Sequence, residues 1–201
     1  APYVGVKEME KQGHFPSYIY RGYKTDIYEG GHRIPLIVSW KGKFSNETNN
    51  SLVSLTDFYA TFAQMVNHKL KDEEAVDSYS IWPILSKQGA SNRKDLVYES
   101  GKGYLSLRTP QLKLVFNGGS GGWGYPNKPA DLAQLPPMQL FNLKEDPSEK
   151  ENIIHDKCYE QEVKEMTQLI RKYVKEGRST PGAEVANDTE NDWKQVNIFM
   201  Q

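Results

Sequence analysis

The feature that most constrains the fold is a charged, glycine-containing stretch that runs directly into an apolar segment. Residues 23–35 read YKTDIYEGGHRIP, and residues 36–40 continue as LIVSW. The nearly continuous apolar run Ile34–Trp40 predicts a strand covered on both faces, in a parallel or mixed sheet. Open α/β folds bind ligands at the ends of such strands. We therefore expect Lys24, which precedes the Gly30-Gly31 turn, to hold a positive charge at the end of a sheet.

Composition limits the class of protein. The 201 residues are 37% hydrophobic, which is enough for one good-sized domain or two small ones. Lys and Arg number 25 against 26 Asp and Glu, so the net charge of -1 creates no field that would attract nucleic acid, and we do not expect nucleic acid as a partner. No apolar run approaches the roughly 20 residues of a membrane-spanning helix, so no membrane span is expected. The single Cys158 excludes an internal disulfide, and the four histidines lack the spacing of metal ligands, so no metal site is expected within this chain.

Hydrophobic periodicity predicts three helices. Residues 4–12 are charged and predict a short solvated helix that ends at Gly13. Apolar residues recur at helical spacing from Leu55 to Val66, which predicts an amphipathic helix packed on the sheet. Residues 160–176 have a single apolar face and are followed by Gly177 at the C′ position, which predicts a long C-terminal helix.

The periodicity changes after Asp95. Four short strand-like runs follow, at residues 96–98, 104–107, 112–116 and 139–143. They predict a small antiparallel four-stranded sheet capped by the C-terminal helix. The predicted fold class is therefore α/β, with a partial mixed sheet and helices in residues 1–94, the antiparallel sheet and helix in residues 95–178, and a polar tail in residues 179–201.

A glycine-rich loop at residues 119–124 has the G-x-G-x-x-G spacing of dinucleotide-binding proteins. The prolines at 126 and 129 prevent the helix that such a site needs at those glycines, so the spacing does not predict a nucleotide site. The indole of Trp123 could instead offer a flat apolar face to a sugar ring, with exposed N–H groups nearby to bind hydroxyls or anions. An ordinary long hairpin loop fits the same residues equally well.

Several charged or polar residues surround the opening stretch. Asp26 and Glu29 are spaced as a catalytic pair could be, but beside Lys24 and Arg33 they are expected to neutralise or orient those cations. His14 and Ser17 lie in a polar and aromatic loop just before the stretch, and simple surface packing explains them as well as a binding role does.

Residues 22–35, GYKTDIYEGGHRIP, resemble the signature of the formylglycine-dependent sulfatases, which are arylsulfatase-type members of the alkaline-phosphatase-like superfamily. In that signature, a lysine four residues before the aromatic residue of an aromatic-Glu-Gly-Gly segment contacts the sulfate. Further blocks resemble the family in the same order: LVSLTD at 52–57, LSLRT with LKL between 105 and 114, and LFNL with DPSEKEN between 140 and 152.

The resemblance implies a role for Lys24, and the roles of the other candidate residues are hypotheses that rest on their polar or aromatic character and their placement near it. Lys24 would contact the sulfate, and the Trp123 loop, with His14 and Ser17, would line the substrate side of the pocket. Four residues would support the site from behind: Asp26, Glu29, His32 and Arg33. The resemblance also implies sulfate-ester hydrolysis in a periplasmic or secreted setting, with a sulfated small molecule or glycan as the substrate.

The sequence also departs from the family pattern. It contains neither C-x-P-S-R nor S-x-P-S-R, the segment in which sulfatases form formylglycine. We therefore expect this chain to be the C-terminal third to half of a sulfatase and to be inactive alone. Formylglycine and the ligands of Ca²⁺, or of another divalent metal, are expected in the missing N-terminal part of the same protein.

Other functions and one further property follow from the same sequence. A non-catalytic glycan-binding or interaction module would need no nucleophile, and a phosphoesterase of the same superfamily would share the fold. Without sheet neighbours, the apolar residues 36–40 would be left at an exposed edge, so we expect the chain to self-associate.

Overall fold

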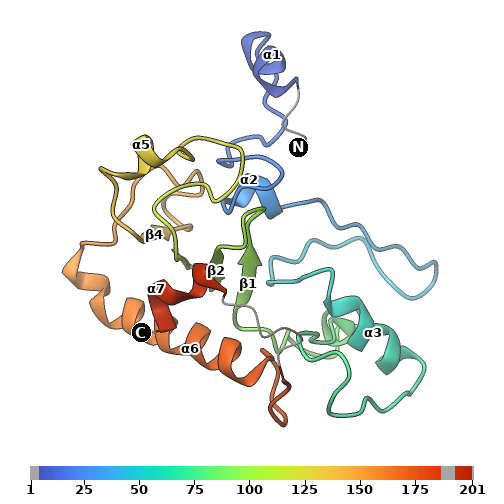
Figure 1. The fold of residues 1–201 in the computed structure, drawn as a ribbon. Helices are drawn as coiled ribbons and strands as arrows, with labels where there is room; N and C mark the ends of the chain where they lie inside the picture. Colours follow the sequence, from blue (N-terminus) through green and yellow to red (C-terminus); the bar gives the residue numbers. More distant parts are fainter. Residues whose placement is uncertain (1–4, 187–192, 201) are drawn as a thin grey trace. The chain divides into compact units, whose positions relative to one another are not determined.

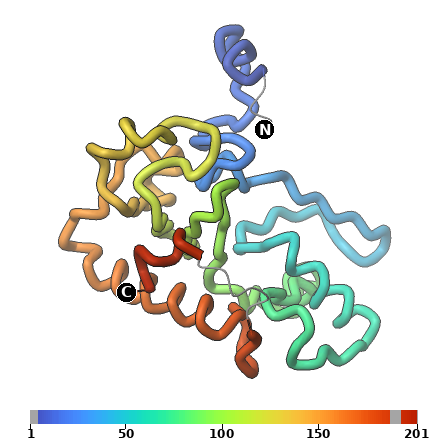
Figure 2. The backbone as a smooth tube through the Cα atoms, in the orientation of Figure 1, coloured from blue at the N-terminus to red at the C-terminus, as the bar shows by residue number. Residues whose placement is uncertain are grey.

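The structure of the protein is a computed structural model that describes residues 5–186 and 193–200, and these form two compact units. Unit 1 comprises the described residues of 1–34, 97–168 and 192–201, and unit 2 those of 35–96 and 169–191. Figure 1 gives the order of the elements and Figure 2 the path of the backbone. The units interleave along the chain, whereas the predicted division at positions 94 and 178 follows sequence order and remains a prediction about the catalytic part and its subdomain.

A four-stranded sheet in the order β1-β2-β3-β4 organises unit 1 (Figure 1). The strands are β1 Leu96–Glu99, β2 Leu105–Arg108, β3 Leu112–Val115 and β4 Gln139–Asn142. β3 pairs antiparallel with β2 and with β4, so that Leu114 lies opposite Leu107 on one side and Leu140 on the other. These three leucines are fully buried, because they lie opposite one another near the middle of the sheet. The predicted antiparallel sheet is confirmed.

The core of unit 1 packs this sheet against residues 22–35, which are called the signature stretch below. Ile27 and Tyr28 are fully buried in a cluster with Val115, Phe141 and Leu143. The rings of Tyr28 and Phe141 meet edge to face with centroids 6.2 Å apart. Burying these apolar side chains fixes the signature stretch on the sheet.

Short helices make up much of the rest of unit 1, and one long helix has residues in both units. They are α1 Val6–Lys11, α2 Glu29–His32, α5 Pro129–Leu132, η1 Lys157–Tyr159, α6 Glu160–Glu176, η2 Lys194–Val196 and α7 Asn197–Met200. α6 is the predicted C-terminal helix; it begins in unit 1 and continues into unit 2, where it ends at Gly177 with φ 65°. Within the predicted polar tail, Phe199 of α7 is buried against Phe116, while residues 187–192 and 201 lie outside the described residues.

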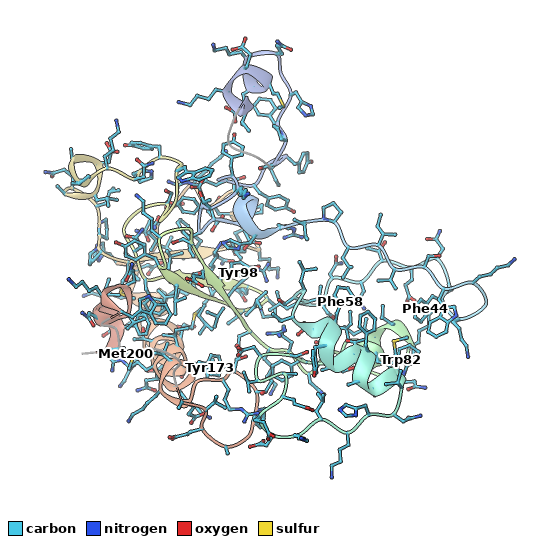
Figure 3. The ribbon with its side chains drawn as sticks, turned by 45° about the vertical axis from the view of Figure 1, so that its right-hand side comes forward. Phe44, Phe58, Trp82, Tyr98, Tyr173 and Met200 are labelled. Carbon is cyan, nitrogen blue, oxygen red and sulfur yellow. The ribbon has the colours of Figure 1, made fainter. Side chains whose placement is uncertain are left out.

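Unit 2 contains α3 Asp57–Met65, α4 Trp82–Leu85 and long extended segments. Trp40, Phe44 and Trp82 pack together, with ring centroids 5.8–6.2 Å apart. Figure 3 labels Phe44 and Trp82 in this cluster and Phe58 on α3. The predicted helix after Leu55 is therefore confirmed as α3. In the described parts of both units, no helix is long and apolar enough to cross a membrane.

The predicted strand at Ile34–Trp40, and with it the mixed sheet of residues 1–94, is absent from the described residues. The segment is extended but pairs with no strand there, and Ile37 is 89% exposed. A strand needs a neighbour to accept and donate its ladder hydrogen bonds, and an apolar run alone does not supply one. For the same reason α3 does not pack on a sheet as predicted: Tyr59, Phe62 and Val66 on it and at its end are exposed.

Candidate functional site

The turn that follows Lys24 depends on two glycines. Glu29-Gly30-Gly31-His32 forms the single helical turn α2. A Cβ atom on Gly30 would come within 3.0 Å of the carbonyl oxygens of Gly22 and Arg21, and one on Gly31 would come as close to that of Asp26. Real Cβ atoms essentially never approach so closely, so only glycine lets this backbone pack on itself. The predicted Gly-Gly turn is thus a tightly packed helical turn.

Lys24 is exposed, and within the described residues its ammonium has no ion-pair partner. The residue after it is strained, because Thr25 is β-branched and has φ 82°. Two contacts hold Thr25 in this conformation: its carbonyl accepts a hydrogen bond from the Gly101 N–H at 2.8 Å, and its hydroxyl accepts one from the Trp123 N–H at 3.2 Å. Backbone strain of this kind persists only where the surroundings enforce it, and it is concentrated at functional sites.

Asp26 is buried beneath the glycine-rich loop. The Gly124 N–H donates to its Oδ1 at 2.8 Å, and the Tyr23 N–H donates to its Oδ2 at 2.9 Å. Burial raises the pKa of Asp26, and the hydrogen bonds from the loop offset part of that rise. The Gly122 N–H is also used within the loop, because it donates to the Ser120 hydroxyl at 3.2 Å.

Glu29 lies in a buried cluster of charges on the sheet. Lys113 Nζ of β3 lies 3.3 Å from Glu29 Oε1, and Arg108 Nε of β2 lies 3.2 Å from the same oxygen. Burial alone would raise the pKa of Glu29, but the two cations outweigh it and lower the pKa. Arg33, half exposed, adds a longer ion pair at 3.6 Å. Arg33 is thus one partner of Glu29, but its main partners are Lys113 and Arg108.

Glu149 completes this cluster from the turn after β4. Its Oε1 lies 3.0 Å from Lys113 Nζ, and its Oε2 accepts a hydrogen bond from the Glu29 N–H at 2.6 Å, at the start of α2. Burial raises the pKa of Glu149, and Lys113 offsets this only in part. Arg21 donates to the Glu149 carbonyl at 2.8 Å and lies over the Tyr28 ring, 3.9 Å from its centroid. The turn after β4 thus holds Arg21, just before the signature stretch, and Glu29 within it.

His32 is held as a neutral ring. It stacks on Tyr98 of β1 with centroids 4.4 Å apart, and within the described part of the chain its Nε2 has no hydrogen-bond partner. Burial, together with the nearby Lys113, lowers the pKa of His32 to about 4. At neutral pH this ring is therefore a packing group without charge.

The two early candidates, His14 and Ser17, lie in the loop before the signature stretch. Ser17 lines an open groove of about 460 Å³, together with Tyr20, Arg21 and Lys150 among others. His14 is exposed in the same loop, and neither His14, Lys24 nor Trp123 lines that groove. Trp123 is 53% exposed, and its N–H is bonded to Thr25, the residue that follows Lys24 in the chain.

Three residues of the charge cluster were not predicted from the sequence: Arg108, Lys113 and Glu149. One signal was available, since Lys113 interrupts an apolar strand in which a lysine must be buried and paired. In the part of the chain that the structure describes, no three side chains of His, Cys, Asp or Glu gather where they could hold a metal ion. The described residues therefore do not fit a divalent metal.

Several known proteins are similar to this chain in sequence and fold. A family model described as Sulfatase matches residues 11–68, which include Lys24 and α2. An N-acetylgalactosamine-6-O-sulfatase of Bacteroides thetaiotaomicron is 31% identical over 158 residues, which are 79% of this chain and 30% of that protein. Human arylsulfatase A is 28% identical over 142 residues, covering 65% of this chain and 28% of that protein.

A solved structure from work on glycosaminoglycan metabolism by Bacteroides thetaiotaomicron superposes with a TM-score of 0.68 at 28% identity, covering 82% of this chain and 34% of that one. The fold is therefore that of part of an alkaline-phosphatase-like α/β domain. Within that class, the chain belongs to the sulfatase family, and it spans about a third of the length of the relatives it matches.

Proposed function

We propose that this chain forms one wall of the active site of a sulfate-ester hydrolase and that Lys24 contacts the sulfate. The observation that carries the proposal is the state of the charges around Lys24. Asp26 is engaged by backbone N–H groups, and Glu29 by Lys113 and Arg108. Lys24 thus keeps an exposed positive charge that no described acid neutralises, on a loop held in a strained conformation.

The chemistry asked of Lys24 is electrostatic. A lysine ammonium is a compact point charge with three donors, which suits a sulfuryl oxygen. It would donate to an oxygen on which negative charge increases as the sulfate ester breaks, and so would stabilise the transition state more than the bound ester. The formylglycine nucleophile and a divalent metal such as Ca²⁺ would come from the N-terminal part of the same protein and supply the attacking oxygen and further charge balance.

A sulfated carbohydrate is the proposed substrate class. The Bacteroides relative that acts on N-acetylgalactosamine 6-sulfate supports a sulfated amino sugar of a glycosaminoglycan. Trp123, half exposed and tied to Thr25, would offer its indole face to the sugar ring. Ser17 and His14 would contact more distant parts of the glycan. A periplasmic or secreted location, where such glycans are met, belongs to the same proposal.

The test uses the full-length protein and a sulfated N-acetylgalactosamine. Lys24→Ala should lower kcat by on the order of 10²-fold or more, because it removes a contact made chiefly in the transition state. Lys43→Ala, which removes another exposed lysine, is the matched control and should leave kcat unchanged. Near-normal turnover by Lys24→Ala would reject the proposed role of Lys24.

Two other outcomes would identify different functions. Hydrolysis of a phosphate ester in place of the sulfate ester would assign the protein to the phosphoesterases of the superfamily. Absence of turnover, together with glycan binding that Trp123→Ala abolishes, would assign a non-catalytic glycan-binding module.

A further inference from the structure

We infer that Asp26 is a positioning residue: the glycine-rich loop closes around its carboxylate, and this clamp fixes Lys24 and Trp123 relative to each other. The clamp consists of residues 23–27 and 120–124, both in unit 1. The inference rests on the proposed sulfate contact of Lys24 and explains how that contact is held in place.

The first part of the clamp is a turn that contains Lys24. The Asp26 N–H donates to the Tyr23 carbonyl at 2.9 Å, and the Tyr23 N–H donates to Asp26 Oδ2 at 2.9 Å. Backbone and side chain of Asp26 therefore both close the turn, and Lys24 and Thr25 are its two central residues. A turn closed by two hydrogen bonds has little conformational freedom, so the backbone holds the Cα and Cβ atoms of Lys24 in one place.

The second part is the close approach of the glycine-rich loop. A Cβ on Gly122 would lie under 3.0 Å from both Asp26 Oδ1 and the Thr25 carbonyl oxygen, and one on Gly124 would crowd the Asp26 carboxylate equally. The Ile27 N–H donates to the Ser120 carbonyl at 2.8 Å. The glycines are thus needed for space around one carboxylate, and the loop is shaped to it.

The third part is the hydrogen bond that links the turn to Trp123. The Trp123 N–H donates to the hydroxyl of Thr25, the residue that follows Lys24. Asp26 also accepts a hydrogen bond from the Gly124 N–H, so the turn holds two consecutive N–H groups, those of Trp123 and Gly124. Lys24 and Trp123 are therefore placed by the same hydrogen bonds, so a sulfate and the sugar ring that carries it would be recognised together.

Asp26 itself does not reach a substrate, since its side chain is buried and both oxygens are used by the clamp. Its effect on catalysis must pass through Lys24 and Trp123. Displacing reacting groups by about 1 Å can cost about 10²-fold in rate, so loosening the clamp is expected to be costly without removing any substrate contact.

The experiment compares two glycine variants of the same loop in the full-length enzyme. Gly122→Ala places a methyl group against Asp26 and Thr25, whereas Gly119→Ala places one equally close to the Pro126 carbonyl, away from the clamp. We expect Gly122→Ala to lower kcat/KM on the sulfated sugar by about 10²-fold and Gly119→Ala to lower it far less at a similar loss in Tm. Equal losses in the two variants would overturn the clamp.

A double-mutant cycle separates positioning from general damage. Asp26→Asn keeps the side-chain volume but replaces one acceptor oxygen by a donor, and so breaks one of its two hydrogen bonds, either to Gly124 or to Tyr23. If Asp26 acts only through Lys24 and Trp123, then adding Asp26→Asn to the double variant Lys24→Ala with Trp123→Ala should lower kcat/KM no further. Independent, multiplying losses would show that Asp26 affects activity by another route and would contradict the inference.

Hydrogen exchange gives a readout that does not depend on the proposed function. In Asp26→Asn, one of the two N–H groups, that of Tyr23 or that of Gly124, loses its acceptor and should exchange at least tenfold faster than in the parent, whether or not the parent hydrolyses sulfate esters. If exchange is unchanged, the clamp is wrong. If exchange accelerates in a parent protein without sulfatase activity, the clamp stands and the proposed function fails.

Discussion

At the scale of the residue, Glu29 forms buried ion pairs with Lys113 and Arg108, and removing the charge of Glu29 should destabilise unit 1 strongly. Glu29→Gln keeps the size of the side chain but leaves Lys113 and Arg108 buried without the carboxylate they share. Breaking one partner of a buried ion pair costs about 3–5 kcal/mol of unfolding free energy. Urea unfolding followed by circular dichroism measures this loss.

An exposed carboxylate of unit 1 provides the control. Glu8 pairs with Lys11 at 3.1 Å, with both side chains more than half exposed. Glu8→Gln should change the unfolding free energy by less than about 1 kcal/mol, because solvent screens such pairs. Comparable effects of the two substitutions would show that the buried cluster adds little beyond a surface pair.

His32 makes the stability of unit 1 depend on pH. Its ring faces Tyr98 of β1 and Lys113 of β3, with Glu29 one turn before it, and its pKa of about 4 in the folded protein is below the ordinary 6.5. Between pH 6.5 and about 4, His32 is therefore protonated in the unfolded chain but neutral in the folded protein. The contribution of His32 is complete above pH 6.5 and is lost as the pH falls to about 4, a loss on the order of 3 kcal/mol.

The variant His32→Phe isolates this contribution. Phenylalanine can stack on Tyr98 but does not titrate, so the decline between pH 6.5 and 4.5 should flatten relative to the parent in urea unfolding at several pH values. The lowered pKa of Glu29 also weakens the fold in acid, but only below its ordinary value of 4.5. An unchanged slope in His32→Phe would assign the decline to other groups.

At the scale of the element, Asp57 anchors α3 of unit 2. Its fully buried carboxylate accepts hydrogen bonds from the Ser54 N–H at 2.8 Å, the Tyr79 N–H at 2.9 Å and Arg93 Nε at 3.0 Å. Asp57→Asn leaves the Arg93 guanidinium buried beside a neutral amide. We expect the amides of α3 to lose hydrogen-exchange protection by about 3–5 kcal/mol, as for other broken buried pairs.

The control for Asp57 is an exposed pair of the same unit. Lys87 and Glu47 lie 2.9 Å apart, and both are more than half exposed. Glu47→Gln should leave the exchange of α3 amides within about 0.5 kcal/mol of the parent. Protection of α3 that survives Asp57→Asn would mean that packing, rather than this carboxylate, holds the helix.

The elements also show which parts of the fold the sequence can predict. α6 and the strands β1–β4 follow from the 3.6- and 2-residue patterns of short segments, and both predictions were right. The strand at Ile34–Trp40 was predicted wrongly because a strand depends on neighbours that an apolar run does not specify. The contact of the glycine-rich loop with Asp26 could not be predicted for a similar reason, since Asp26 lies 98 residues away from Gly124 in the chain.

The same limit applies to the site. The position of Lys24 could be predicted because the motif is local and contiguous. The pairing of Glu29 with Lys113, and of both with Glu149, joins three distant segments, and only the lysine inside an apolar strand indicated it. Long-range pairing of charges is decided by the fold, since each residue alone is equally suited to the surface.

At the scale of the whole molecule, the apolar surface of unit 2 predicts that this 201-residue chain associates with itself. Large apolar side chains are exposed on the extended segment and on α3: Leu36, Ile37, Val38, Trp40, Leu55, Tyr59, Phe62 and Val66. An extended apolar segment with unused backbone hydrogen-bonding groups is a template for pairing with another chain.

Solution scattering and sedimentation velocity over a range of protein concentrations test this prediction. The average mass should rise with concentration, and Ile37→Lys combined with Phe62→Lys should lower it, because two charges then enter the apolar surface. Tyr125→Lys is the matched control, since Tyr125 is 76% exposed but belongs to unit 1. A chain that stays monomeric at every concentration, or a control that dissociates it equally well, would show that the apolar surface of unit 2 does not drive association.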